Sequence, residues 1–327
     1  MNELSLAVFA SETGAHLVRP PSSARWNAHV RAFDAQAYEQ RLGAQGLRFL
    51  ARMAPDFPPL LRAIHDPPPG LFLRGAAAPE TLSRPAVGVV GARACSGYGA
   101  SVARTLAREL AAAGLVVVSG LARGVDAEAH RGALEAGGVT VAVLGCGVDR
   151  DYPAAHAELA RRIAERGLVV SEYAPGVEPA PWRFPARNRI IAGLCAAVAV
   201  VEARDRSGAL ITADLALEEG REVFAVPGEI TSALSAGTND LLKLGASPLT
   251  RAADVLSCFG LEAAAARAPD LSPEAARLLA LLRDASAGAD ELTRRSGLTA
   301  DAVARALVEL ELADAASLQS GLYRAQS

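Results

Sequence analysis

The pattern that best predicts the fold lies in Leu115-Val-Val-Val-Ser-Gly-Leu-Ala-Arg-Gly-Val-Asp126. Its first four residues form a continuous apolar run, which is typical of a strand buried on both faces of a parallel sheet. The glycines after this run mark a tight loop, and a helical segment, Asp126–Ala136, follows. This order of strand, loop and helix predicts a βαβ unit.

The same alternation extends outward from about Pro85 to Phe259. Apolar runs predict further strands at Val87–Val90, Val139–Leu144, Leu168–Val170, Ala196–Val201 and Val223–Val226. Helical segments are predicted at Ser101–Ala113, Ala154–Glu165 and Thr212–Glu219. We therefore predict an α/β fold with an extended Rossmann-like, doubly wound sheet that is mainly parallel.

The two flanks of this region have a different pattern. The N-terminal flank is rich in alanine and helix-like up to the proline cluster Asp66-Pro-Pro-Pro-Gly70, which predicts a helical domain that ends near a turn. The C-terminal flank predicts a winged-helix-like domain. The predicted division is a helical, SAM-like domain (1–80), a Rossmann-like domain (81–260), a linker (261–271) and the winged-helix-like domain (272–327).

The winged-helix-like region is expected to hold three helices, at Pro273–Arg283, Asp290–Ser296 and Thr299–Leu312, and a β-wing at Ala315–Arg324. Asp290 and Thr299 are the expected N-caps. The shared core is expected to consist of Leu292, Leu298, Val303, Leu307 and Leu310.

Composition excludes several classes of protein. The 327 residues are 51% hydrophobic, which favours a folded chain, yet no apolar run is long enough to span a bilayer. The N-terminus has no basic segment followed by an apolar core, and the four cysteines lie far apart without Cys-x-x-Cys spacing. We therefore expect a cytoplasmic protein without a membrane partner, a zinc site or disulfides.

Charge is unevenly distributed along the chain. The formal net charge is −3, and the ten acidic and seven basic residues from Glu262 to the C-terminus account for all of it (7 − 10 = −3). The remainder is balanced, and its basic residues gather in particular loops. Lys243 is the only lysine, so nearly every cation is an arginine, whose planar fork suits phosphate oxygens.

Glycine, serine and arginine recur in the loops that follow the predicted strands. Ligands of an open parallel sheet bind beyond the carboxyl ends of its strands, so these loops are expected to form one surface. Glycine lets the backbone approach an anion, and helix N–H groups and arginine attract negative charge. The loop residues expected to contact phosphate are Gly91, Arg93, Ser96, Ser119, Gly120, Arg123, Gly124, Ser207 and Gly208. Their repetition indicates a phosphate-binding surface rather than one pocket.

The stretch from Pro179 to Gly193 carries three arginines, two aromatic residues and no acid. Its arginines and Asn188 suit phosphate, while Phe184 or Trp182 suits stacking on an unpaired base, an interaction worth about 1–3 kcal/mol. The alternative is that the two rings close the core and the arginines are solvated, and this alternative is the simpler one for either ring alone. The expected binding residues here are Arg183, Phe184, Arg187, Asn188 and Arg189.

Motifs for nucleotide cofactors and catalysis are missing. No Gly-x-x-x-x-Gly-Lys-Ser/Thr occurs, because Lys243 is followed by leucine, and Gly145-Cys-Gly147 lacks the third glycine of the dinucleotide fingerprint. Glu172 and Glu202 follow strands, where a carboxylate can serve hydrolysis or glycosyl transfer, yet no motif sets a nucleophile or metal ligand beside them. We therefore predict a protein that is not an enzyme and needs no metal or cofactor.

Asp126 and His130 lie four residues apart on a predicted helix and share one face. That spacing suits an acid–base pair, but a capping aspartate and a half-buried histidine account for it more simply.

Several motifs, in order along the chain, resemble the DNA-processing protein A family, also called DprA or Smf. They are Ser119-Gly-Leu-Ala-Arg-Gly-Val-Asp126, Ser171-Glu-Tyr-Ala-Pro-Gly176, Phe184-Pro-Ala-Arg-Asn-Arg-Ile-Ile-Ala-Gly-Leu194, Val223-Phe-Ala-Val-Pro-Gly228 and Gly237-Thr-Asn-Asp-Leu-Leu-Lys-Leu-Gly-Ala246. The resemblance covers roughly Phe57 to Leu256.

The resemblance implies a function. Members of this family bind incoming single-stranded DNA during natural transformation, displace or bypass single-strand-binding protein, and load RecA recombinase. They act as homodimers through the Rossmann-like domain and need no cofactor. The matched motifs would place DNA contacts at Arg93, Arg123, Arg183, Phe184, Arg187, Asn188 and Arg189. A role in DNA repair is the alternative to transformation.

Two other functions compete with this one. A nucleotide phosphoribohydrolase shares the wider architecture, but the stretch Arg206-Ser-Gly-Ala-Leu-Ile-Thr-Ala-Asp214 lacks the glycines and the glutamate of its Pro-Gly-Gly-x-Gly-Thr-x-x-Glu loop. A recombinase adaptor with incidental DNA affinity is the third hypothesis.

The third helix of the C-terminal region carries Asp301, Arg305, Glu309 and Glu311. A helix that enters the major groove needs cations on that face. We therefore predict a protein contact or a structural role for this domain.

Overall fold

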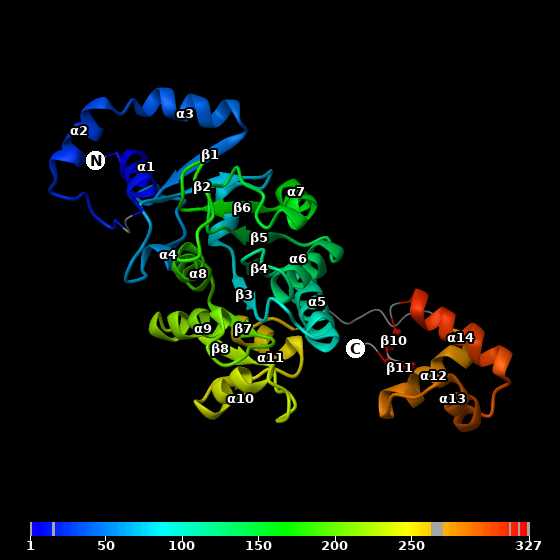
Figure 1. Cartoon of the computed structure of the whole chain (residues 1–327). Coiled ribbons are helices and arrows are strands. Elements are labelled where there is room, and N and C mark those ends of the chain that lie inside the picture. Colours follow the sequence, from blue (N-terminus) through cyan, green and yellow to red (C-terminus); the bar gives the residue numbers. More distant parts are fainter. Residues whose placement is uncertain (1, 15–16, 263–270, 314, 320, 326–327) are drawn as a thin grey trace. The chain divides into compact units, whose positions relative to one another are not determined.

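The computed structural model describes residues 2–14, 17–262, 271–313, 315–319 and 321–325 (Figure 1). The chain divides into two compact units, at Met1–Ala264 and Ala265–Ser327. Each unit is described by itself below. In the described parts of the chain, no helix combines the length and the apolar character that crossing a membrane requires.

One nine-stranded sheet forms the centre of the first unit in the part of the chain that the structure describes. Its strands are β1 (Leu47–Ala51), β2 (Gly70–Arg74), β3 (Ala86–Val90), β4 (Val116–Ser119), β5 (Thr140–Val143), β6 (Leu168–Ser171), β7 (Ala197–Val200), β8 (Glu222–Ala225) and β9 (Ser247–Pro248). The strand order is β1-β2-β6-β5-β4-β3-β7-β8-β9. All pairs from β6 to β9 are parallel, whereas β2 is antiparallel to both neighbours. The mainly parallel sheet is therefore confirmed, and every predicted strand is present.

Helices cover both faces of this sheet. They are α1 (Glu3–Thr13), α2 (Ala24–Ala32), α3 (Ala35–Ala44), α4 (Pro59–Arg62), α5 (Gly97–Ala112), α6 (Val125–Glu135), α7 (Ala157–Arg166), α8 (Arg183–Leu194), α9 (Gly208–Glu218), α10 (Ala236–Lys243) and α11 (Ala252–Leu256), with short 3-10 turns at Pro79–Ser83, Ala154–His156 and Ser257–Phe259. One face packs against α4, α8, α9 and α10, and the other against α5, α6 and α11. Residues alternate between the faces along each strand, as in β3, where Val90 packs on the first face and Val89 on the second.

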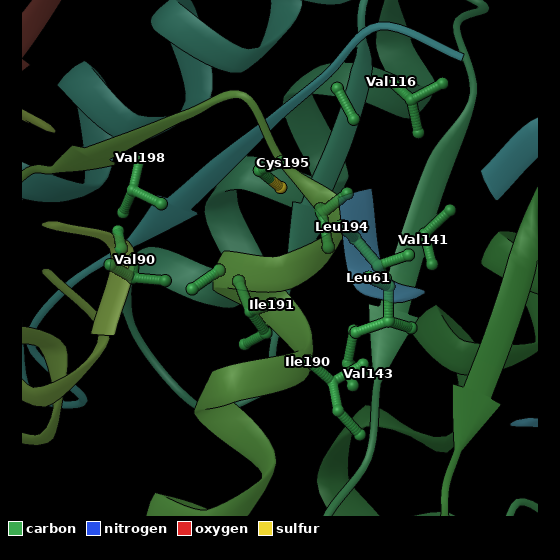
Figure 2. Packing of buried hydrophobic residues seen from close by; sticks show 14 of the residues in the cluster. Leu61, Val90, Val116, Val141, Val143, Ile190, Ile191, Leu194, Cys195 and Val198 are labelled. Carbon is green, nitrogen blue, oxygen red and sulfur yellow. The ribbon is translucent and has the colours of Figure 1, made fainter. Parts of the chain in front are cut away.

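Helix α8 forms from the arginine-rich stretch that had no predicted secondary structure. Its buried face packs on the sheet, and Figure 2 shows Ile190 and Ile191 in the same cluster as Val143 of β5 and Val198 of β7. Burial of each such side chain contributes about 1.5–3 kcal/mol. This packing fixes the rest of α8, including its polar residues, over the carboxyl ends of the strands.

The segment from Leu47 to Arg74 differs from the expected helical region, because it adds β1 and β2 to the main sheet. Leu71, Phe72 and Leu73 of β2 are fully buried, and the ring of Phe72 lies 4.9 Å from that of Phe49. A short run that is apolar on both faces does not distinguish a strand from a buried helix; only the position of β2 between β1 and β6 settles it. The domain boundary at residue 80 stays a prediction.

The second unit contains α12 (Pro273–Asp284), α13 (Ala289–Ser296), α14 (Ala300–Leu312) and an antiparallel pair, β10 (Ala316–Gln319) and β11 (Leu322–Ala325). Its core includes Leu292, Val303, Leu307 and Leu310, with Leu298 partly buried beside them. The three predicted helices and the wing are therefore confirmed.

The predicted caps of this unit have different outcomes. Thr299 caps α14, and its hydroxyl accepts the N–H of Ala302 at 3.3 Å. The prediction for Asp290 is wrong, because α13 starts one residue earlier and Gly288 is its N-cap. Asp290 instead lies in the first turn, where a carboxylate faces the positive end of the helix dipole.

The acidic face of α14 is partly used inside the unit. Glu309 accepts hydrogen bonds from the backbone N–H and the hydroxyl of Ser272, both at 2.6 Å, and these bonds lower the pKa of its carboxyl. Arg305 pairs with Asp301 on the same helix. Glu309 thus fixes the start of α12, in keeping with a structural role for at least this residue.

Candidate nucleic-acid interface

Two adjoining cavities lie at the carboxyl edge of the sheet, where the loops after β3, β4, β5 and β7 meet. The first, the arginine cavity, has a volume of about 420 Å³ and lies between the loops after β3 and β7. The strand order reverses at this point, because β4 lies on one side of β3 and β7 on the other. Ligands of doubly wound sheets bind at such switch points. The lining of the arginine cavity includes Arg93, Arg204, Arg206, Ser207 and Gly208.

The second, the aromatic cavity, has a volume of about 430 Å³ and lies between the loops after β4 and β5. Its lining includes Arg123, Leu144, Cys146, Tyr152 and Pro153. Five residues line both cavities, namely Arg93, Ala94, Ala122, Phe184 and Arg187. The two cavities therefore form one continuous surface.

Four exposed arginines surround this surface, namely Arg93, Arg123, Arg204 and Arg206. Within the described residues, none of the four forms a salt bridge with a carboxylate, whereas many other arginines do. Arg206 has a positive φ of 58°, which costs a non-glycine residue about 1–2 kcal/mol. These guanidinium groups are available to an anionic ligand.

Phe184 lies at the centre of the surface and is half-buried. Its ring stacks on Tyr152 with 5.4 Å between centroids and 21° between planes, and the guanidinium of Arg93 lies 5.4 Å from its centroid. A Cβ on Gly145 would lie 2.9 Å from this ring, so only glycine allows the approach. Phe184 therefore lines the cavities, and neither it nor Trp182, which is 46% exposed, belongs to the core clusters.

Arg187 is buried, and its guanidinium is used within the protein. It donates to the carbonyl oxygens of Gly120, at 2.8 Å, and Val143. Burial lowers its pKa to about 10, and the nearby carboxylate of Asp126 acts in the opposite direction. Asp126 in turn accepts the backbone N–H groups of Gly120 and Ala122, at 3.1 and 3.2 Å. Arg187 and Asp126 thus both hold the loop after β4, one through a carbonyl oxygen and the other through N–H groups.

A third buried side chain holds the same loop. The Nδ1 of His156 lies 3.0 Å from the carbonyl oxygen of Leu121, which can only accept, so Nδ1 donates. Leu121 has a φ of 58°, a conformation that a non-glycine residue keeps only when its surroundings impose it. Asp126, His156 and Arg187 therefore fix the three residues before Arg123 and set where its exposed side chain begins.

The remaining polar residues of α8 also have partners in the protein. Asn188 donates to the carbonyl of Gly208 at 3.0 Å, which fixes the start of α9. Arg189 donates to Asp66 at 3.1 Å and to Glu172 at 2.5 Å. Arg183 donates to the carbonyl of Glu178 and lies over the rings of Tyr173 and Trp182.

Two of the expected serine contacts lie inside the protein. Ser96 caps α5, and both its N–H and its hydroxyl bind the buried carboxylate of Glu202. Ser119 is fully buried and donates to the carbonyl of Val89 at 2.6 Å. The start of α9 differs, because a Cβ on Gly208 would meet no atom within 4 Å. An anion therefore has access to the N-terminus of α9, whereas Glu202 already occupies that of α5.

The structure brings together only part of the expected site. The expected residues that line the cavities are Gly91, Arg93, Gly120, Arg123, Phe184, Arg187, Asn188, Ser207 and Gly208. Those that do not line them are Ser96, Ser119, Gly124, Arg183 and Arg189. Gly124 has a φ of 73° and packs so closely on the backbone of Ala92 that a Cβ would lie 2.2 Å from its carbonyl oxygen.

Tyr152, Arg204 and Arg206 are cavity residues that were not among the expected contacts. The two arginines lie in a loop after a predicted strand, so their position in the sequence could have identified them as binding residues. Tyr152 offered no such signal, because its neighbour Phe184 is distant in the sequence. Among the residues that the structure describes, no group of three or more His, Cys, Asp or Glu side chains could hold a metal ion.

This chain combines a Rossmann-like domain with a winged helix. Comparisons with known proteins place it in a class of DNA-processing proteins. Residues 48–260 match the family described as DNA recombination-mediator protein A, and residues 262–321 match the DprA winged helix domain. Since the first match alone covers most of the chain, the protein belongs to the DNA-processing protein A (DprA/Smf) family. The predicted family is confirmed.

Named relatives support this membership. The chain is 49% identical to the DNA processing protein DprA of Streptococcus pneumoniae over 199 residues, which cover 61% of this chain and 70% of the relative. It is 42% identical to the protein Smf of Escherichia coli over 269 residues, 79% of this chain and 71% of the relative.

Solved structures also support membership of this family. The S. pneumoniae DprA structure superposes with a TM-score of 0.67 at 38% identity, covering 78% of this chain and 93% of that one. The DNA processing protein A of Helicobacter pylori gives a TM-score of 0.59 at 32% identity, covering 65% and 95%, and its structure is described as giving insight into a single-stranded DNA binding mode.

Proposed function

We propose that this protein binds single-stranded DNA across the two cavities and does not change it chemically. The observation that carries the proposal is the gathering of four exposed arginines around the half-buried ring of Phe184 at the switch point of the sheet. Cations that follow a groove and a ring that can stack on a base are the two elements of single-strand binding. The single-strand binding described for the H. pylori relative supports the proposal.

Within the proposed site, the exposed arginines Arg93, Arg123, Arg204 and Arg206 hold phosphates. Gly208 and the N-terminus of α9 add backbone N–H groups for the same purpose. Arg187 and Asn188 position the loops from within, because burial and internal hydrogen bonds occupy their polar groups. A direct DNA contact by Arg183 or Arg189 stays a prediction.

The proposal extends to recombination. Through its bound strand the protein would load RecA recombinase in the cytoplasm, past single-strand-binding protein, in natural transformation or in repair. Membership of a family described as recombination mediators supports this step. It is tested by RecA filament assembly on DNA coated with single-strand-binding protein, where stimulation by the wild type and its loss in an Arg93→Ala variant are expected. Stimulation retained by a variant that no longer binds DNA would favour an adaptor instead.

A homodimer through the first unit is part of the same proposal. Ile230 and Leu244, which are 96% and 83% exposed, precede and follow α10 in the chain, and we propose these two apolar side chains as dimer contacts. Sedimentation equilibrium of Leu244→Asp, compared with Met53→Asp at another exposed position, tests this surface. A dimer unaffected by the first change would exclude it.

A nucleotide phosphoribohydrolase is disfavoured by the positions of the carboxylates. Glu202 is buried and bound by Ser96, and Glu172 is paired with Arg189. Neither of these two glutamates lines the arginine cavity or the aromatic cavity. Release of free base from a nucleoside monophosphate would reverse this conclusion.

Fluorescence anisotropy with a labelled oligo-dT and the matching duplex, each at low and moderate salt, tests the proposed function. We expect tight, salt-sensitive binding to the single strand and weak binding to the duplex. Equal affinity for both, or no binding, would mean that the arginines serve another anion.

A further inference from the structure

We propose that the outer face of α5, α6 and α7 binds phosphates of the DNA strand where it leaves the two cavities. The inference rests on the single-strand binding proposed above and adds a second contact surface outside both cavities. We call the residues that carry it the helix-face arginines. They are Arg104 and Arg108 of α5, Arg131 of α6, and Arg162 and Arg166 of α7, and none of them lines either cavity.

Close packing of the three helices brings these arginines onto one face. Gly132 of α6 lies so near α5 that a Cβ there would overlap the carbonyl oxygen of Arg104, and Gly138, just after α6, packs on α5 in the same way. Figure 1 shows α5 and α6 side by side. On the other side of α6, the Nη1 of Arg166 in α7 would lie 3.4 Å from a Cβ on Gly137. The cations of the three helices are therefore neighbours in space.

Two carboxylates of α6 lie among the helix-face arginines. Glu135 accepts a hydrogen bond from the Nε of Arg104 at 2.9 Å. Glu128 lies 3.7 Å from the Nη1 of the same arginine and pairs with Arg131. Two of the five arginines are therefore already paired with carboxylates of the protein.

The other three, Arg108, Arg162 and Arg166, form no salt bridge within the part of the chain that the structure describes. Arg162 and Arg166 are exposed and lie one turn apart on α7. A hydrogen bond from Arg104 lowers the pKa of the Glu135 carboxyl, and the charges of Arg108 and Arg162 add to this effect. Five arginines and two carboxylates leave a surplus of three positive charges on this face (5 − 2 = 3).

This face continues directly from the proposed DNA site. Helix α5 follows the loop that carries Arg93, and α6 follows Arg123 after a single residue, Gly124. Arg131 comes eight residues after Arg123, which is about 12 Å along a helix axis. A strand held at the two loop arginines would therefore meet further cations as it leaves the cavities. Guanidinium groups suit phosphate oxygens, so the surplus charge favours the DNA backbone as the occupant of this face.

Two lengths of oligo-dT separate the helix face from the cavities. A strand of about 6 nucleotides should occupy the cavities alone, whereas one of about 16 should also reach the helix face. The double variant Arg162→Ala/Arg166→Ala should bind the longer strand about tenfold more weakly at moderate salt. It should also reduce the magnitude of the slope of log K against log salt by about 1.4, which corresponds to two phosphate contacts on a single strand. Its binding of the shorter strand should equal that of the wild type.

Replacement of Glu135 by Gln should have the opposite effect on the longer strand. The loss of one carboxylate should increase the magnitude of the salt slope by up to about 0.7 and strengthen binding, a gain that misfolding cannot produce. Arg161→Ala is the matched control, because Arg161 is adjacent to Arg162 on the same helix but pairs with Glu158 and Glu165. The control should bind both strands like the wild type.

Equal losses on both strand lengths, an equal loss in the control, or wild-type binding of the longer strand by the folded double variant would overturn the proposal. Binding of a labelled oligo-glutamate that the double variant loses, with unchanged DNA affinity, would assign the face to an acidic peptide instead. Absence of binding to either strand by the wild type would remove the proposed function itself. Anisotropy measures each affinity, and circular dichroism verifies that each variant is folded.

Discussion

The carboxylate of Glu202 accepts two hydrogen bonds from Ser96, one from the backbone N–H at 2.8 Å and one from the hydroxyl at 2.5 Å. Ser96 is the N-cap of α5, and Gly99 lies so near that a Cβ would be 2.4 Å from the carboxylate. The protein therefore supplies its own anion at a helix N-terminus that the glycine-rich sequence seemed to leave for a ligand. The proposed DNA site consequently uses Arg93 and the start of α9 instead.

Replacement of Glu202 by Gln should lower the free energy of unfolding by about 1–3 kcal/mol, because a buried charge-assisted pair of bonds is weakened. The salt dependence of DNA binding should stay unchanged. Urea denaturation and anisotropy measure the two effects. Loss of DNA affinity without loss of stability would place Glu202 in direct contact with the strand.

Replacement of Arg93 or Arg123 by Ala should weaken single-strand binding across all sequences and reduce the salt slope by about 0.7 in each case. Each guanidinium is exposed beside a cavity and is expected to meet one phosphate. Arg161→Ala is the control, since Arg161 is exposed on α7 and paired with Glu158 and Glu165. A control variant that weakens binding as much would show that general charge, not this surface, attracts the DNA.

A substitution at Asp126 should alter the position of Arg123, because Asp126 holds the loop after β4 that leads to this arginine. Asp126→Asn weakens the acceptor of two backbone N–H groups, so the loop should lose its fixed geometry and DNA affinity should fall. In an Arg123→Ala background the same change should have little further effect on binding. Anisotropy on the two single variants and the double variant gives the coupling. Additive losses would mean that Asp126 affects binding without acting through Arg123.

His130 should make stability depend on pH. It is fully buried with its Nδ1 2.7 Å from the hydroxyl of Thr140, and burial lowers its pKa from 6.5 to about 3. Below pH 6.5 the histidine of the unfolded chain binds a proton, whereas the buried histidine of the folded chain stays neutral. The free energy of unfolding is therefore highest above pH 6.5 and decreases as the pH falls from 6.5 towards 3. The loss is up to about 1.4 kcal/mol per pH unit.

Urea denaturation of the wild type and His130→Asn at pH 7.5 and 5.5 checks this linkage. The variant should be less stable at both pH values, but its stability should change less between them. The same pH dependence in both proteins would assign it to other groups.

Deletion of the residues after Gly260 should leave most of the single-strand affinity intact. The cavities belong entirely to the first compact unit, and α14 presents acidic side chains rather than a cationic face. Anisotropy on the truncated and full chains, with circular dichroism to verify folding, measures the difference. A collapse of affinity in a folded truncated protein would assign the winged helix a DNA contact.

Much of the fold could be predicted because its signals are local. The runs from Val87 to Val226 are apolar without alternation, and such runs are buried only between two layers of helices, so they predict a parallel sheet. The β1–β2 pair and α8 could not be predicted in this way. Gly70–Arg74 is too short to show a period, and the polar half of α8 hides its helical pattern.

The chemistry of the strand-end loops can be read from their residues alone: glycine, serine and arginine recur there, and no motif for a cofactor accompanies them. Which of these side chains are exposed at the cavities depends on tertiary contacts. Arg93 and Arg187 are the same residue type in equally glycine-rich or basic surroundings, yet one is exposed and the other buried. The guanidinium of Arg187 is buried because it reaches carbonyl groups 67 and 44 residues away, which only the packed sheet brings near. Tyr152 and Phe184 likewise become a stacked pair through contacts between distant loops, and burial and stacking of this kind depend on three-dimensional neighbours rather than on sequence spacing.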